Sequence, residues 1–207
     1  MLPVPAWFAD VLTQELFRWL TLSADQISKL YIHYSYLERW NKKISLTSVE
    51  PGREMITRHY CESLFLAAHL PSRDVPKIAD LGSGAGFPGV PVAVFLPESQ
   101  VSLIESVQRK AVFLREATRP LSNVRVIGKR AEEIEGGFDL LISRAVNPKD
   151  VLANVPRLAR SVALLIGENG LEAIRSTPGI ACSEPIRLPW GDRRFLVMGS
   201  VPRGTTQ

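Results

Sequence analysis

DLGSGAGFPG, residues 80–89, is the stretch that decides the fold of this chain. The apolar run Lys77–Leu81 predicts a strand directly before the glycines, and Phe87–Leu96 predicts a helix directly after them, with Pro88 tolerated in its first turn. Glycines allow a positive φ and let the backbone approach a ligand without a Cβ in the way. Amides at a helix start favour electron-rich groups. The segment therefore predicts a nucleotide-like ligand between a strand and a helix, and a plain tight turn is the alternative.

Downstream of this turn, short apolar runs alternate with amphipathic stretches. Such alternation predicts an α/β fold with a Rossmann-like, mostly parallel sheet that binds ligands at the carboxyl ends of its strands. The last two runs are closely spaced and predict an antiparallel, hairpin-like C-terminal end. The expected strands are Val101–Glu105, Val124–Gly128, Asp139–Ser143, Val162–Ile166, Ile180–Leu188 and Phe195–Val201, and the expected helices are Gln108–Thr118 and Val151–Arg160.

Upstream of the turn, the first seventy residues have helical periodicity. Apolar residues recur at helical spacing between Trp7 and Leu20, and Ser23 with Gln26 forms a capping box before a second helix. Residues 41–51 lack this pattern and predict a loop, followed by a third helix over residues 53–70. We therefore expect a helical cap, residues 1–72, packed on a cofactor-binding core, residues 73–207.

The chemistry around the turn favours S-adenosylmethionine over NAD. Glu105 ends the next expected strand, where a carboxylate can accept hydrogen bonds from both ribose hydroxyls. The glycines Gly82, Gly84 and Gly86 form GxGxG, whereas the dinucleotide pattern GxGxxG would place its third glycine at Phe87. Asp80 suits the cationic amino group of methionine and would face a pyrophosphate unfavourably.

Composition limits the class of protein. The 207 residues are 45% hydrophobic and 22% charged, as in a globular domain, and contain no run of eighteen apolar residues. The first ten residues lack a secretory signal, and Cys61 and Cys182 show neither disulfide nor metal-ligand spacing. We expect a cytoplasmic monomer that holds no metal and contacts no membrane. The net charge of +4 is compatible with a polyanionic partner.

Four segments together resemble the RsmG family, also called GidB or glucose-inhibited division protein B. They are Asp80–Gly89, Arg58-His59, Ala131-Glu132-Glu133 and Ser143-Arg144-Ala145. Members of this family are methyltransferases with the class I fold, and they use S-adenosylmethionine to methylate N7 of one guanine in small-subunit (16S) ribosomal RNA. The similarity extends from about Tyr36 to Gly170, and the Phe-Pro-Gly continuation of the glycine turn is specific to few methyltransferases.

The resemblance implies roles for individual residues. Gly82 and Phe87 would contact the cofactor, and Glu105 would bind its ribose. Ala131 and Glu132 would lie near the adenine. The catalytic candidates are Arg144, beside the methionine end or the target base, with Arg58 and His59 facing the reaction cleft. The chain departs from the family at Glu62, where Asp is frequent, and at Ile166, where Lys is common.

Less specific interpretations remain open for several residues. Arg58 and His59 could lie on the exposed face of a helix, and Glu132 in a solvated loop. We expect His33 and His69 at the surface, and both cysteines in the core. The cations available for RNA phosphates are Lys42, Lys43, Arg53, Arg58, Lys129, Arg130, Arg193 and Arg194.

Other functions are compatible with the same turn. They are a small-molecule methyltransferase, an NAD-dependent oxidoreductase, and a non-catalytic RNA-binding module. Guanine N7 carries a free lone pair at neutral pH, so N7 methylation needs no general base. The lack of an obvious acid–base pair is therefore consistent with ribosomal RNA methylation.

Overall fold

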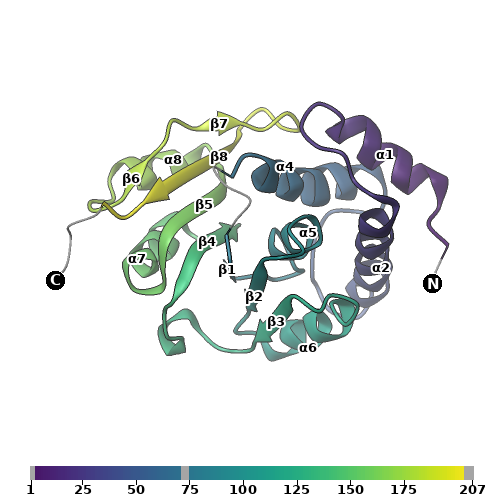
Figure 1. Ribbon diagram of the computed structural model, residues 1–207, viewed down its shortest axis with the longest axis horizontal. Helices are drawn as coiled ribbons and strands as arrows, with labels where there is room; N and C mark the ends of the chain where they lie inside the picture. Colours follow the sequence, from purple (N-terminus) through teal and green to yellow (C-terminus); the bar gives the residue numbers. More distant parts are fainter. Residues whose placement is uncertain (1–2, 71–74, 203–207) are drawn as a thin grey trace.

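One mixed sheet forms the centre of the molecule in the computed structural model, which describes residues 3–70 and 75–202 (Figure 1). Its strand order is β3-β2-β1-β4-β5-β8-β6, with β7 also paired to β8. Strands β1 to β5 are parallel, and β8 runs antiparallel to β5, β6 and β7. The strands are β1 Lys77–Leu81, β2 Gln100–Ile104, β3 Val124–Ile127, β4 Phe138–Arg144, β5 Ala159–Gly167, β6 Ala181–Cys182, β7 Ile186–Arg187 and β8 Arg194–Ser200.

Helices cover the two faces unequally. The α-helices are α1 Ala6–Leu16, α2 Ala24–Asn41, α3 Arg53–Met55, α4 Glu62–Ala68, α5 Gly89–Phe95, α6 Gln108–Ala117, α7 Pro148–Leu158 and α8 Asn169–Arg175, with a π-helix η1 Ile56–Cys61 and a 3₁₀-helix η2 Ala131–Glu133. Figure 1 shows α5 and α6 beside β1, β2 and β3, with α2 packed outside α5 and α6, and α7 with α8 beside β4 and β5 on the other side. Within the described ranges, no helix is long and apolar enough to cross a membrane.

Two hydrophobic clusters follow from this layering. The larger joins the N-terminal helices to the sheet, through residues such as Phe8 and Tyr60 together with Phe113 of α6. The smaller packs α7 and α8 on the opposite face, through residues such as Val155 and Leu141. The expected boundary between cap and core, at residues 72 and 73, lies outside the described residues.

The predicted parallel sheet and antiparallel C-terminal end are confirmed, with differences at the ends of elements. The capping box of Ser23 and Gln26 is present at the start of α2. Helix α5 begins at Gly89, two residues later than expected, and Pro91 is its third residue, where a backbone N–H would have no partner within the helix. The run at residues 180–188 forms two short strands instead of one. Helix α8 was not predicted, because its seven residues are too few to show a helical period.

Candidate active site

A cavity of about 400 Å³ opens at the carboxyl ends of β1, β2 and β4. The glycine turn supplies one wall, and the chain that follows β4 supplies another. The helical cap closes the cavity through η1 and the loop after α2. The lining residues are Leu46, Thr47, Ser48, Val49, Arg58, His59, Gly82, Ser83, Gly84, Ala85, Phe87, Glu105, Lys110, Arg144, Ala145 and Val146.

Gly82 is a position where the backbone must approach its neighbours closely. Its φ is +73°, and a Cβ placed there would lie 2.4 Å from Val146 Cγ2. A side chain would therefore be strained and would also push Val146 out of place. Because Val146 lines the cavity, the bare backbone at Gly82 keeps this space open for a ligand.

A second cavity, of about 270 Å³, adjoins the first along Gly82, Glu105 and Val146. It is lined on its other side by Ala131 and Glu132, the residues that the family resemblance would place near the adenine. The two cavities therefore form one elongated cleft across the ends of β1 and β2. Its size is within the range of small-molecule sites, about 300–1,000 Å³.

Glu105 lies where the two cavities meet. It follows β2 and is only 6% exposed. Its Oε2 accepts a hydrogen bond from the Gly84 amide (2.9 Å) and its Oε1 accepts one from the Val107 amide (2.7 Å). These two bonds fix the carboxylate, and each oxygen keeps a further lone pair for a ligand hydroxyl.

Asp80 lies beneath the turn, away from the residues that line the cleft. It is fully buried, and its Oδ2 accepts a hydrogen bond from the Gly89 amide (3.0 Å) at the start of α5. Burial raises its pKa to about 7. Its Oδ1 has no hydrogen-bond partner among the described residues. Because buried polar atoms in proteins usually have a partner, this oxygen is available for a hydrogen bond from water or from a ligand at the turn.

His33 is buried, contrary to the expectation of a surface position. It is 1% exposed, and burial lowers its pKa to about 4, so the ring is neutral. Nε2 donates to the Ala85 carbonyl (3.0 Å), and Nδ1 accepts from the Tyr60 hydroxyl (2.8 Å). The ring also packs against Gly86, which has φ +92° and where a Cβ would lie 2.9 Å from Nε2. His33 therefore joins α2 and η1 to the glycine turn, and Gly86 allows this contact.

His59 and Arg144 form a pair at the floor of the first cavity. His59 is 7% exposed and stacks on Phe87, with ring centroids 4.7 Å apart. Burial, aided by the charge of Arg144, lowers the His59 pKa to about 3. The neutral ring accepts from Arg144 Nη1 at Nδ1 (2.8 Å), and its Nε2 donates to Thr47 Oγ1 (2.8 Å). The alternative of an exposed position is therefore wrong for His59.

Arg58 also reaches the cavity but is half exposed. It pairs with Glu54 one turn earlier (2.8 Å), and its side chain is 42% exposed. The helix widens to a π-turn over residues 56–61, which places Arg58 and His59 side by side at the cavity wall. Such π-turns occur frequently at functional sites. The sequence pattern did not predict this turn.

Glu62 is a buried acid behind Arg144 that the sequence did not predict as a site residue. It is 1% exposed, with Oε1 2.5 Å from Arg194 Nη1 and Oε2 3.9 Å from Arg144 Nη2. Burial raises its pKa to about 7, because desolvation outweighs the attraction of the two arginines. Burial also lowers the Arg144 pKa. The sequence feature that could have identified Glu62 is a carboxylate at the start of the otherwise apolar run ESLFLAA, which becomes the buried helix α4.

Four of the eight cations proposed for phosphate contact have acidic partners in the fold. Arg53 pairs with Glu15, Arg58 with Glu54, Arg193 with Glu168 and Arg194 with Glu62. The other four, Lys42, Lys43, Lys129 and Arg130, form no ion pair with a described residue. No group of three His, Cys, Asp or Glu side chains in residues 3–70 and 75–202 is placed to hold a metal ion.

Comparison with known proteins identifies relatives over most of the chain. A family model described as rRNA small subunit methyltransferase G matches residues 26–167. A ribosomal RNA small subunit methyltransferase G of Xanthomonas campestris pv. campestris (strain B100) is 36% identical over 191 residues, which cover 86% of this chain and 89% of the relative. One of the same description from Stenotrophomonas maltophilia (strain K279a) is 39% identical over 160 residues, covering 75% and 72%.

Solved structures confirm the predicted fold. A SAM-dependent methyltransferase from Aquifex aeolicus superposes with a TM-score of 0.61 at 15% identity, covering 82% of this chain and 98% of that one. Fibrillarin from Aeropyrum pernix, solved with natively bound S-adenosyl-L-methionine, gives a TM-score of 0.55 at 15% identity, covering 67% and 73%. At this identity the likeness concerns the Rossmann-like methyltransferase fold alone.

Proposed function

Because the chain belongs to the rRNA small subunit methyltransferase G family, we propose that it transfers a methyl group from S-adenosylmethionine to N7 of a guanine in small-subunit ribosomal RNA. Family membership identifies S-adenosylmethionine as the cofactor and small-subunit ribosomal RNA as the class of substrate. It also argues against an NAD-dependent oxidoreductase and against a non-catalytic RNA-binding module. The choice of guanine N7 is our proposal. It is supported by the charge and hydrogen bonding of the residues at the floor of the cleft.

The observation that carries the proposal is the elongated cleft formed by the two adjoining cavities. The bare turn at Gly82 and Gly84 leaves room for a ligand, and the fixed carboxylate of Glu105 lies at the middle of the cleft. These residues fit a nucleoside with an amino-acid tail, with its ribose at Glu105. Ala131 and Glu132 would then hold the adenine end. The other cavity, with Arg144 and Phe87, would hold the methionine end and admit the target base.

The titratable groups at the cleft suit a reaction that removes no proton before the methyl group is attacked. When bound, S-adenosylmethionine supplies a methyl group on a sulfonium sulfur. A neutral nitrogen lone pair can attack the methyl carbon, and the sulfur then leaves as a neutral thioether. His59 is neutral, but its Nδ1 lone pair is already used by Arg144, so it has no free site for a base. A guanine N7 needs no base, whereas a ring amine or a hydroxyl benefits from one.

Arg144 is the residue that we assign to the target base. Its Nη1 is held by His59, which leaves other guanidinium donors to reach into the cavity. Arginine donors match the O6 and N7 edge of guanine. A hydrogen bond to O6 would orient the base and leave the N7 lone pair free for the methyl group. Phe87, backed by His59, offers an aromatic surface beside it.

Methyl transfer to ribosomal RNA tests the proposal. Small-subunit RNA from cells that lack this protein would be incubated with the enzyme and methyl-labelled cofactor, then treated with borohydride and aniline. This treatment cleaves the chain at N7-methylguanine. We expect label in the RNA and one new cleavage site, with both strongly reduced in Arg144→Ala. Labelled RNA that resists cleavage would reject N7, and unlabelled RNA would reject the RNA as substrate.

A further inference from the structure

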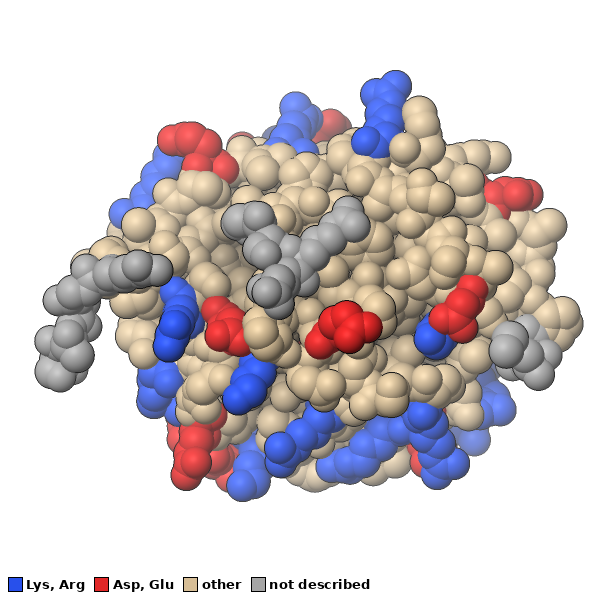
Figure 2. Space-filling model, in the orientation of Figure 1, with Lys and Arg blue, Asp and Glu red and all other residues tan. Residues whose placement is uncertain are grey.

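The positive charge of this chain is concentrated in one segment. Residues 108–130 contain seven Lys or Arg and a single Glu, a net charge of +6, while the whole chain carries +4. The remaining residues are therefore net negative. The segment comprises α6, the edge strand β3 and the first residues after β3. Figure 2 shows Lys and Arg gathered along the lower edge of the molecule, the region where Figure 1 places α6 and β3.

Most of these cations have no acidic partner among the described residues. Arg119 pairs with Glu116, and the other six form no ion pair with a described residue. The cations with acidic partners, such as Arg53 and Arg193, lie elsewhere in the fold. We name the six unpaired cations the α6–β3 surface: Arg109, Lys110, Arg115, Arg125, Lys129 and Arg130.

The α6–β3 surface is continuous with the cofactor cleft. Lys110 lines the first cavity, and Lys129 and Arg130 line the second. The end of β3 also packs closely on α6, since a Cβ at Gly128 would lie 3.1 Å from Arg115 Nη2. Cations from α6 and from the chain that follows β3 therefore lie together on the β3 side of the cleft.

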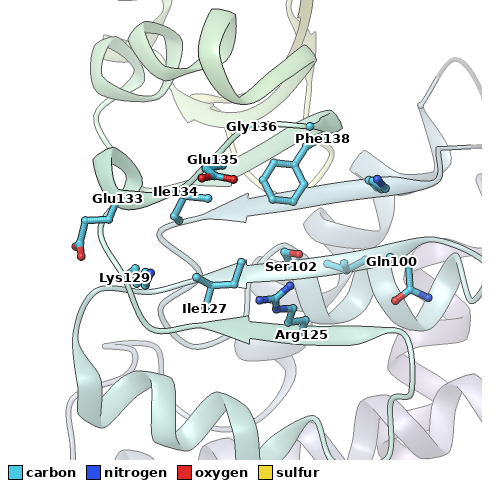
Figure 3. A pocket seen from close by; sticks show the side chains of 13 residues that line it. Gln100, Ser102, Arg125, Ile127, Lys129, Glu133, Ile134, Glu135, Gly136 and Phe138 are labelled. Atoms are coloured by element: carbon cyan, nitrogen blue, oxygen red, sulfur yellow. The ribbon is translucent and has the colours of Figure 1, made fainter.

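An open groove extends this surface across the sheet. The connection from β3 to β4 contains only the short η2 where parallel sheets usually have a helix. The face of the sheet that carries Ser102 of β2 and Arg125 of β3 is therefore only partly covered, and Arg125 is exposed. The groove encloses about 570 Å³. Figure 3 shows the side chains of Ser102 and Arg125 along adjacent strands, with Lys129 toward one end.

Polar residues on this face indicate a surface made for a polar partner. Ala79, Ser102 and Arg125 are cross-strand neighbours on β1, β2 and β3, and polarity increases toward the edge. Parallel strands with both faces covered are instead near-continuously apolar. Two acids, Glu133 and Glu135, lie on the β4 side of the groove and would confine an anion to the β2–β3 side.

We propose that the α6–β3 surface and the open groove bind the phosphate backbone of the ribosomal RNA substrate next to the target guanine. This inference rests on the proposed function and specifies where the RNA lies. Six unpaired cations beside the cleft match the negative charge of RNA, and the groove's hydroxyl and amide groups can bond to phosphate and ribose oxygens. Arg18 after α1, Arg160 of β5 and Arg175 of α8 would remain outside the interface.

The test compares two variants with the same change in charge. Arg109→Gln, Arg115→Gln and Arg125→Gln together remove three cations of the surface, none of which lines the cofactor cleft. The control, Arg18→Gln, Arg160→Gln and Arg175→Gln, removes three exposed cations elsewhere. Binding to small-subunit RNA would be measured between 50 and 200 mM salt, with cofactor binding and methyl transfer measured on the same samples.

We expect only the surface variant to bind RNA with a weaker salt dependence than the unchanged enzyme. Each phosphate contact adds about 0.7 to 0.9 to the slope of log affinity against log salt, so three lost contacts lower the slope by about 2 to 3. Over this salt range the affinity of the unchanged enzyme would fall about 20- to 40-fold more than that of the variant. Cofactor affinity should stay the same in all three proteins.

Equal slopes in both variants, or no salt-dependent RNA binding by the unchanged enzyme, would overturn the inference. The inference would also be overturned if the α6–β3 surface bound an acidic protein more tightly than it binds the RNA. The proposed function fails separately, if the unchanged enzyme binds RNA but transfers no methyl group to it. In that case the slopes still decide whether the α6–β3 surface binds RNA.

Discussion

Replacing Gly82 by alanine should weaken cofactor binding in a way that a second substitution partly repairs. The new Cβ would lie 2.4 Å from Val146 Cγ2, at a residue with φ +73°. The backbone conformation costs an L-residue about 1–2 kcal/mol. The clash adds about 1–3 kcal/mol, typical of an overpacked site. Because Val146 lines both cavities, it would relieve the clash by moving into the cleft.

The two costs affect different measurements. The backbone cost lowers the free energy of unfolding, measured by denaturant titration. The clash raises the dissociation constant for S-adenosylmethionine, measured by calorimetry, and about 1–3 kcal/mol corresponds to about 5- to 150-fold. Adding Val146→Ala should recover most of the affinity lost through the clash but none of the stability lost through the backbone.

The matched control is Val146→Ala alone, so that the four proteins form a double-mutant cycle. We expect a coupling free energy of about 1–3 kcal/mol for cofactor binding, as for residues in direct contact. Unchanged cofactor affinity in Gly82→Ala would refute the placement of the cofactor at the turn. Weakened affinity that Val146→Ala does not improve would refute the role given to Val146.

Four further changes test other parts of the site. Glu105→Gln should raise the cofactor dissociation constant about tenfold or more in calorimetry, because bonds to the ribose lose their charge; unchanged affinity would exclude Glu105 from the ribose. Glu62→Gln should gain stability relative to the unchanged protein as pH rises from about 5 to about 7. The folded protein holds the Glu62 proton up to its pKa of about 7, whereas the unfolded chain releases it near 4.5, so the natural protein loses stability across this window. Denaturant titrations should show a difference of at most about 1.4 kcal/mol per pH unit, and a flat difference would contradict the raised pKa. His33→Phe should destabilise the fold by about 2–4 kcal/mol in the same titration, because Tyr60 and Ala85 lose their buried partner; a change under 1 kcal/mol would show that these bonds contribute little. Arg144→Lys should lower turnover about tenfold or more with cofactor affinity less affected, since lysine lacks the planar donor set; normal turnover would remove Arg144 from base recognition.

The sequence was sufficient for the parts of the fold that depend on local patterns. The glycine turn, the parallel strands, the capping box at Ser23 and the position of Glu105 after β2 all follow from periodicity and spacing. These features involve residues close together in the chain, whose preferences agree with the final fold. The family resemblance added residues such as Ala131, which spacing alone would not have identified.

Features that depend on contacts between distant segments were not predictable in this way. His33 looks like any histidine on a helix, but it meets the turn 52 positions later in the chain. Glu62 gains its role from Arg144 and Arg194, which reach it from β4 and β8. The π-turn around His59 and the uncovered face beside β3 likewise have no periodic signature in the sequence.

The most direct test of the central claim is a crystal structure of the protein with S-adenosylmethionine. We expect electron density for the cofactor in the joined cavities, with its ribose at Glu105 and its methionine end in the cavity of Arg144. Density for the cofactor elsewhere, or a cleft that stays empty at saturating cofactor, would contradict the assignment of the glycine turn as the methyl-donor site.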